Sequence, residues 1–192
     1  LLSQKEENEE GLPNLWITNV FSDTKNNLWI GAQDFLKIYS LKEQKFRDFQ
    51  LPANLKIDIN VLFIRPVNEN LIAVGIANYG VLFYDINSLK IEDSITTLEG
   101  LKTDNITVND LAVINDSCYI SSGSNIFSGA INNHRWVMGR KITIPAISNN
   151  VINCLAAGKN NELWLGTNSG IGKLELIRSQ FSPIVNNEFL NA

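Results

Sequence analysis

The chain repeats itself about every 45 residues, and this period constrains its fold more than any other feature. Residues 17–32 (ITNVFSDTKNNLWIGA) can be laid over residues 151–167 (VINCLAAGKNNELWLGT), and residues 60–75 and 109–123 follow the same outline. An Asn opens each apolar run and a Gly closes the next one; these positions are Asn19, Asn60, Asn109 and Asn153, and Gly31, Gly75, Gly123 and Gly166. The four glycines are 44, 48 and 43 residues apart. Such a period is typical of β-propeller blades and of helical arrays.

Residue type decides between these two architectures. The apolar runs are short, rich in Val, Ile, Phe, Tyr and Trp, and separated by Asn, Asp, Gly and Ser, which is typical of strands joined by tight turns. No stretch of a dozen residues keeps a helical spacing of apolar residues. Four strands are expected in each repeat: 17–22, 28–32, 36–41 and 46–49; 60–64, 71–75, 81–85 and 91–95; 108–114, 117–121, 125–131 and 134–138; 151–156, 162–166, 171–176 and 180–182.

We therefore predict an all-β chain, a β-propeller segment of about four four-stranded antiparallel blades. The predicted divisions are an acidic arm or link at 1–11, blade 1 at 12–57, blade 2 at 58–100, blade 3 at 101–148, blade 4 at 149–183, and a tail leading to further sequence at 184–192. A seven-bladed ring at this period needs roughly 315 residues. The chain is thus expected to form part of a larger, about seven-bladed propeller, with the remaining blades of a parent chain as its partners.

Composition excludes several classes of protein. With 192 residues and 44% hydrophobic content the chain can bury a core without a metal or disulfides. A net charge of −4 without a dense Lys/Arg cluster argues against a nucleic-acid partner, and the apolar runs are far shorter than a membrane span requires. The N-terminus is not a signal peptide as it stands. Cys118 and Cys154 show no disulfide framework and are expected to act as small hydrophobic residues.

The shared positions favour architecture over chemistry. A Gly that closes a strand permits a bend or a close approach by neighbouring backbone, and a short amide can bond backbone groups that lack a strand partner. Trp29 and Trp164 take the same place in their repeats, where Ile72 and Tyr119 are expected to replace them in the middle two. These side chains are expected to pack between blades.

Two stretches resemble the two-component-regulator propeller repeat. They are NNLWIGA with FLKIYS (residues 26–32 and 35–40) and NNELWLGTNSGIGKLEL (residues 160–176); the second repeat keeps Gly75 and the YGVLFYD run, and the third little beyond residues 121–123. The resemblance implies a propeller in the periplasmic sensor region of a hybrid two-component histidine kinase. It also implies a periplasmic or extracellular location. Any kinase activity would lie outside this chain.

Catalytic and metal-binding patterns are missing from the sequence. His134 is the only histidine, and no zinc-protease, paired-cysteine, phosphate-loop or serine-nucleophile motif occurs. Asp110 and Asp116 are close in sequence, but a strand residue and a turn residue need not share a site. We therefore expect no enzyme activity, no metal and no cofactor, although carboxylates from different blades could still meet.

The turns between the second and third strands are the candidate binding loops, because in propellers they gather at one mouth of the central channel. Their candidate ligand-binding residues are Asp34, Asn78, Tyr79, Ser124 and Asn168. They are polar with one aromatic ring, as a sugar-binding surface would be. The simpler alternative, which we favour for any single position, is that they are turn residues.

These patterns and the resemblance lead to three hypotheses. The first is a non-catalytic extracytoplasmic sensor or ligand-binding propeller segment of a hybrid two-component protein, with an oligosaccharide or a protein as its ligand. The second is a protein-interaction propeller in a secretion or surface-assembly machine, such as the type IX apparatus. The third is a propeller polysaccharide lyase or hydrolase, which a single histidine disfavours.

Overall fold

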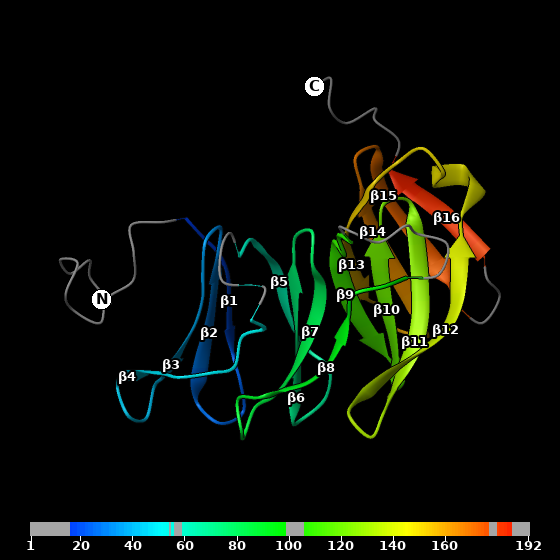
Figure 1. The fold of residues 1–192 in the computed structure, drawn as a ribbon. Coiled ribbons are helices and arrows are strands. Elements are labelled where there is room, and N and C mark those ends of the chain that lie inside the picture. The colour runs from blue at the N-terminus through cyan, green and yellow to red at the C-terminus, as the bar shows by residue number, and fades with distance from the viewer. Residues whose placement is uncertain (1–15, 54, 56–58, 99–105, 177–179, 186–192) are drawn as a thin grey trace.

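The structure is a computed structural model that describes residues 16–53, 55, 59–98, 106–176 and 180–185. The predicted arm at 1–11 and most of the predicted tail, residues 186–192, lie outside these residues. Sixteen strands form four separate four-stranded sheets, each with its strands in sequence order and antiparallel (Figure 1). The predicted all-β propeller architecture is confirmed.

Each sheet is one blade. Blade 1 contains β1 (Ile17–Ser22), β2 (Asn27–Ala32), β3 (Leu36–Ser40) and β4 (Lys45–Arg47). Blade 2 contains β5 (Val61–Pro66), β6 (Leu71–Ile76), β7 (Gly80–Asp85) and β8 (Ile91–Ile95). Blade 3 contains β9 (Asp110–Ile114), β10 (Ser117–Ser122), β11 (Asn125–Asn132) and β12 (Arg135–Thr143), followed by a 3-10 turn, η1 (Pro145–Ile147). Blade 4 contains β13 (Ile152–Ala157), β14 (Glu162–Thr167), β15 (Gly170–Glu175) and β16 (Gln180–Val185).

The largest departure from the expected strands is β12, which continues five residues past the predicted end at Met138. Its pairing with β11 shifts register between Ser128 and Gly129, so an extra residue is accommodated in β12. Such a bulge lets a strand continue through a mismatch in pairing. Gly139 lies beside that shift and looks like a breaker in the sequence, although it is an interior residue of the strand.

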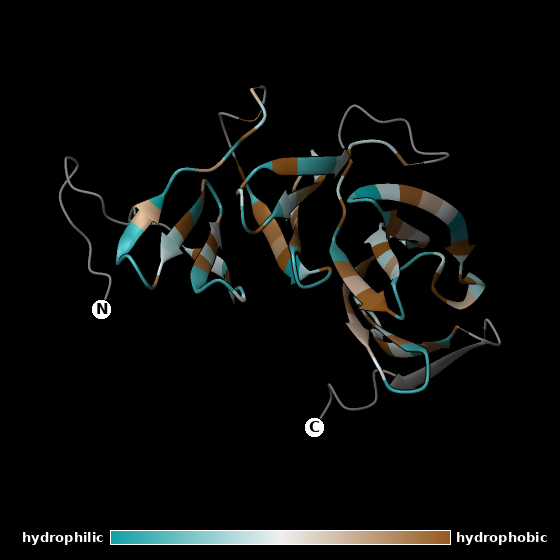
Figure 2. Ribbon diagram, turned by 90° about the horizontal axis from the view of Figure 1, so that it is seen from below, coloured by the Kyte–Doolittle hydropathy of each residue, from teal (hydrophilic) through white to brown (hydrophobic). Residues whose placement is uncertain are grey.

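The four sheets follow one another around an arc, so that the face of each lies against the face of the next (Figures 1 and 2). The first strands of the blades, β1, β5, β9 and β13, contact one another in turn along the inner side of the arc. Three apolar clusters fill the spaces between consecutive blades, each drawing buried residues from both. The core of this protein therefore lies between its sheets.

The side chain of Trp29 shows how the polar turn and the apolar core of blade 1 are joined. Its ring is fully buried, with its centroid 5.4 Å from that of Tyr84 in blade 2. Its Nε1 donates to Oδ2 of Asp23 at 2.8 Å, and the other oxygen of that carboxylate accepts from the backbone N–H groups of Lys25 and Asn27. One carboxylate thus closes the β1–β2 turn and satisfies the indole donor inside the core.

Strand pairing corrects one position of the predicted glycine set. Gly31, Gly75 and Gly166 pair with third-strand residues Leu36, Val81 and Ile171, and in blade 3 the pairing that fits this series is Ser121 with Ile126. The four third-strand partners are each 45 residues apart. Gly123 instead lies in the turn after β10 with φ +57°, so including it in the set was wrong. Ser121 holds the position that a glycine holds in the other three blades, and Gly123 lies two residues after it.

The asparagines also fail to share one register position. Asn19 pairs with Gly31, Asn153 occupies the register shift before Cys154, and Asn60 precedes β5. Asn19 Nδ2 donates to the carbonyl oxygens of residues 61 and 62 in blade 2, and Asn109 Nδ2 donates to that of residue 152 in blade 4. Two asparagines therefore bond backbone of the following blade, although the sequence pattern overstated their equivalence.

The tryptophan position needs a similar shift in blade 2. Pairing places Ala73 and Tyr119, with Trp164, at the position of Trp29, so the assignment of Ile72 to it was wrong. Ile72 points to the opposite side of its sheet, into the cluster shared with blade 1. Gly75 follows Ala73 by two residues, as Gly31 follows Trp29 and Gly166 follows Trp164, so the spacing to the glycine identifies the position.

The indole of Trp164 lies on the side of blade 4 that faces away from blade 3. Leu163 and Leu165 point into the cluster shared with blade 3, and Trp164 between them is only half-buried. Gly158 occupies the place that Asp23 holds in blade 1. Trp29 packs between blades 1 and 2, whereas the described residues contain no blade after the face of Trp164.

Both ends of the arc carry apolar side chains that a neighbouring blade would cover. Val20 on blade 1 is 58% exposed, and Ile171, beside Trp164 on blade 4, is 47% exposed. The sheet has no other way to bury these side chains than against another sheet.

A polypeptide of these 192 residues alone is therefore expected to self-associate through its end faces. Sedimentation velocity over a range of concentrations should show growing species, and Val20→Lys with Ile171→Lys should suppress them. A monodisperse monomer with a cooperative melt would contradict this expectation.

The two cysteines give a second test of the blade 4 end face. Cys118 is buried, which raises the pKa of its thiol to about 12, whereas Cys154 is exposed on the face of Trp164. Iodoacetamide at pH 8 should label Cys154 alone in the folded segment, because the thiolate is the reactive form, and both cysteines in urea. In a longer polypeptide with a following blade, Cys154 should become protected; unchanged labelling there would argue against such a blade.

Candidate functional site

The inner edge of the arc brings the most unusual side chains of the chain together. In each blade the first strand has a partner on one side only, so every second backbone N–H and C=O points toward the channel. At this edge β5, β9 and β13 supply a buried carboxylate, a guanidinium and a cavity. We call this region the hub.

The carboxylate of Asp110 is the centre of the hub. It is 2% exposed, and its two oxygens accept from Nε and Nη2 of Arg65 in blade 2, each at 3.1 Å. They also accept from the backbone N–H of Leu111 at 2.9 Å and of Leu155 in blade 4 at 2.9 Å. Four donors therefore satisfy one buried carboxylate, as a buried charge requires, and they come from three different blades.

Arg65 is less enclosed than its partner. Its side chain is 41% exposed, and it meets Asp110 with the pair of N–H groups on one side of the guanidinium, a two-bond arrangement that fixes orientation. A further donor, Nη1, lies 3.3 Å from the carbonyl oxygen of Ile64. The charge is thus held in place by protein contacts on one side and open on the other.

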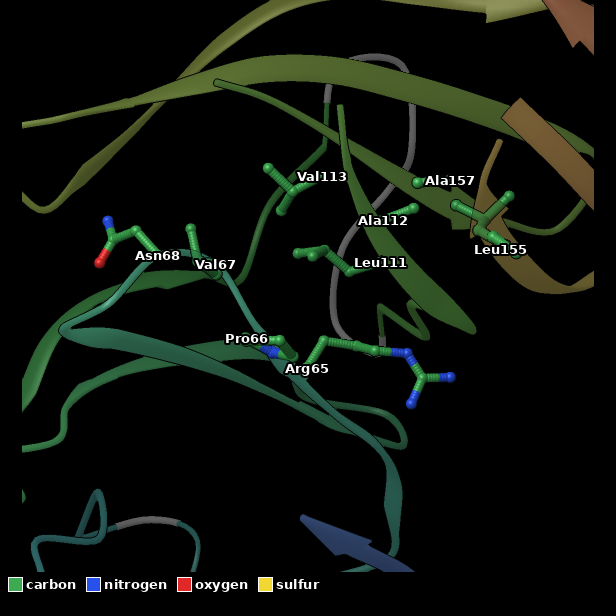
Figure 3. A pocket seen from close by; sticks show the side chains of 10 residues that line it. Arg65, Pro66, Val67, Asn68, Leu111, Ala112, Val113, Leu155 and Ala157 are labelled. Atoms are coloured by element: carbon green, nitrogen blue, oxygen red, sulfur yellow. The ribbon is translucent and has the colours of Figure 1, made fainter. Parts of the chain in front are cut away.

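A cavity of about 450 Å³ lies beside this pair (Figure 3). It is lined by the end of β5 and the turn after it, by β9 and by β13: Arg65, Pro66, Val67, Asn68, Leu111, Ala112, Val113, Leu155, Ala156 and Ala157. β5 and β13 end beside the cavity, so it lies near the turns that join the first and second strands of each blade. We call this end of the blades the hairpin rim. The opposite rim, where the chain crosses from blade to blade, we call the crossover rim.

The five candidate ligand-binding residues all lie at the crossover rim, one turn in each blade, and none of them lines the cavity. Asp34, Asn78 and Asn168 are exposed, whereas Ser124 and Tyr79 are half-buried. Burial raises the pKa of the Tyr79 phenol, whose ring contacts the cluster between blades 1 and 2. Their role in binding stays a prediction.

Polar contacts along this rim join the turns to the crossover segments. Asn78 exchanges hydrogen bonds with Thr107, which precedes blade 3, through its backbone N–H at 3.2 Å and its Oδ1 at 3.3 Å. Asn168 Oδ1 accepts from Asn153 Nδ2 at 2.6 Å. Two of the candidate residues therefore already have partners within the protein.

The other residues considered for catalysis or metal binding, His134 and Asp116, lie in exposed turns. His134 occupies a two-residue hairpin turn at positive φ with Asn133, and its Nδ1 lies 3.6 Å from Glu92 of blade 2. Asp116 lies in an exposed turn, away from the buried Asp110. Within the described part of the chain, no three His, Cys, Asp or Glu side chains come together as metal ligands.

Sequence reasoning missed the hub, although the sequence contained a signal for it. Arg65 and Asp110 are 45 residues apart, as are Asp110 and Leu155, so each contact spans one repeat. An ionised residue inside an apolar first strand requires a partner, and a charge of opposite sign one period away is the candidate.

Comparison with known proteins gives the same fold. Residues 146–169, around the start of blade 4, match the two component regulator propeller family. No match was found among curated protein sequences. No helix in the described parts of the chain has the length and apolarity to cross a membrane.

Several solved structures resemble the chain. The extracellular domain of a B. thetaiotaomicron protein described as a hybrid two component system, BT4673, has a TM-score of 0.73 at 22% identity, over 97% of this chain and 24% of that one. A similar domain from the same organism, BT3049, gives 0.68 at 16% identity, over 94% and 25%. The computationally designed Ika4 protein gives 0.61 at 16% identity, over 90% and 94%. The chain thus spans about a quarter of the two natural domains.

Removing the charge of Asp110 is expected to weaken all three inner strands at once. Asp110→Asn leaves the guanidinium of Arg65 without its counter-ion and turns an amide N–H toward backbone donors, so the free energy of unfolding should fall by about 3 kcal/mol or more. Arg65→Met should cost at least as much, because it leaves the buried carboxylate of Asp110 without a counter-ion and with two of its four donors.

Urea denaturation of a soluble polypeptide containing these blades would measure both losses. The matched control is Asp116→Asn in the exposed β9–β10 turn, where asparagine tolerates the positive φ and little change is expected. Equal stability of the Asp110→Asn and Asp116→Asn proteins would show that the hub does not hold the blades together.

Proposed function

We propose that this chain is a non-catalytic, ligand-binding part of an extracytoplasmic sensor propeller in a hybrid two-component protein. The observation that carries the proposal is the family match at residues 146–169, which falls on one of the four blades that the structure describes. The two extracellular domains of similar fold support an extracytoplasmic location. The exposed apolar ends of the arc support further blades of the same parent chain as its partners.

Determining the gene sequence on both sides of this segment tests the signalling role directly. We expect an export signal and more propeller repeats, then a membrane-spanning helix and a histidine kinase core. A parent protein with a C-terminal sorting domain and no kinase would favour the secretion-machine alternative and overturn the proposal.

For the ligand we propose an oligosaccharide bound at the crossover rim. Asp34, Asn78 and Asn168 offer exposed polar groups there, and Tyr79 offers part of an aromatic ring. Amide groups and aromatic faces suit the hydroxyls and apolar faces of sugars.

A glycan array with the intact extracytoplasmic region, followed by calorimetry on any hit, tests this ligand class. Asn78→Ala with Tyr79→Ala should lower affinity at least about tenfold, equivalent to about 1.4 kcal/mol. Asn87→Ala, an exposed asparagine at the hairpin rim, is the matched control and should bind as the parent does. Glycan binding that survives the double substitution unchanged would exclude the crossover rim as the site.

A further inference from the structure

The hub cavity has mainly apolar walls. Its side chains are aliphatic except for Arg65 and Asn68, so the only ionised side chain that lines it is a cation. The carboxylate beside it, Asp110, is buried and already accepts four hydrogen bonds. A small molecule in this cavity would meet hydrocarbon on most sides, and the Arg65 guanidinium with backbone N–H and C=O groups at a few points.

The guanidinium of Arg65 has unused N–H donors. Of its five N–H groups, those on Nε and one on Nη2 bond Asp110, and one on Nη1 bonds the carbonyl oxygen of Ile64. One N–H on each terminal nitrogen has no partner among the described residues. Two such donors can bond the two oxygens of a carboxylate. Figure 3 shows the side chain extended below Leu111, with its terminal nitrogens at the far end.

Backbone N–H groups of β9 and β13 add hydrogen-bond donors on the channel side of these strands. The N–H groups of Leu111 and Leu155 point away from their strand partners, since both bond Asp110 at the inner edge. Two residues further along, Val113 and Ala157 therefore point their N–H groups the same way, and both residues line the cavity. In blade 2 the equivalent residue is Pro66, which has no N–H.

We propose that the hub cavity binds a small organic carboxylate. Its carboxylate would accept from the unused N–H donors of the Arg65 guanidinium, and its apolar body would lie among Leu111, Val113 and Leu155. The ion pair with Asp110 holds the guanidinium in position before the ligand arrives, which lowers the cost of ordering it. The cavity volume of about 450 Å³ is within the range of small-molecule sites. This site goes beyond the proposed sensor function and is separate from the crossover rim.

Benzoate is a suitable probe, because it combines a carboxylate with a compact apolar body, and benzamide is its uncharged isostere. Calorimetry with the intact extracytoplasmic protein should show one saturable benzoate site per chain. Benzamide should bind at least about tenfold more weakly. Propionate serves as a smaller carboxylate in the same experiment.

Two variants test whether benzoate binds in the hub cavity. Arg65→Gln removes the charge, and Ala157→Leu fills the cavity from an exposed position without touching the ion pair; each should reduce benzoate affinity at least about tenfold. Arg47→Gln, on the outer strand of blade 1, should leave it unchanged. If Arg65→Gln proves too unstable to measure, Ala157→Leu and benzamide decide the question.

Absence of saturable binding by both benzoate and propionate would overturn the proposal, as would benzoate binding that Ala157→Leu leaves intact. Glycan binding at the crossover rim is measured separately with the Asn78 and Tyr79 substitutions. Either site can therefore fail while the other stands.

Discussion

The structure depends on burial between sheets rather than within them. Each blade is a single antiparallel sheet with two apolar faces, and a sheet of this kind is stable only when another layer covers both. The fully buried Trp29 and the half-buried Trp164 hold the same position in their blades, and they differ because, among the described residues, a blade follows the first and none follows the second. The same constraint explains the repeat period, since every blade must offer the next one a matching face.

Burial alone does not fix how consecutive blades are placed at the inner edge, where the strands have unpaired backbone groups. There the protein uses short polar links between one first strand and the next, from Asn19 to blade 2 and from Asn109 to blade 4. Asp110 extends this to three blades through Arg65 and Leu155. A buried carboxylate tolerates no missing donor, so it holds the inner strands at defined distances that nonpolar contacts would leave loose.

The strands and their order could be predicted from the sequence because alternation, turn residues and period agree with one another. Register could not, because a nearby residue looks equivalent in a list of letters: Gly123, two residues on, took the place of Ser121, and Ile72, one residue before, took that of Ala73. The hub was missed for a different reason. Its parts lie in three repeats, 45 residues apart, and the one-dimensional sequence does not show which face of each first strand they occupy.

Comparison of equivalent positions in the four blades also shows where a binding site can arise. At the strand position opposite the glycine, the four blades carry Asn19, Phe63, Asp110 and Cys154, and two residues later they carry Phe21, Arg65, Ala112 and Ala156. In the middle of the second and third strands most matching positions keep an apolar or small residue, and the exceptions, Lys37 and Lys173, lie on the two end blades. The first strand borders the channel with its backbone edge, while side chains such as Phe63, Leu111 and Leu155 still pack between blades. Between those packed positions the innermost strands of this protein differ by an ion pair and a cavity.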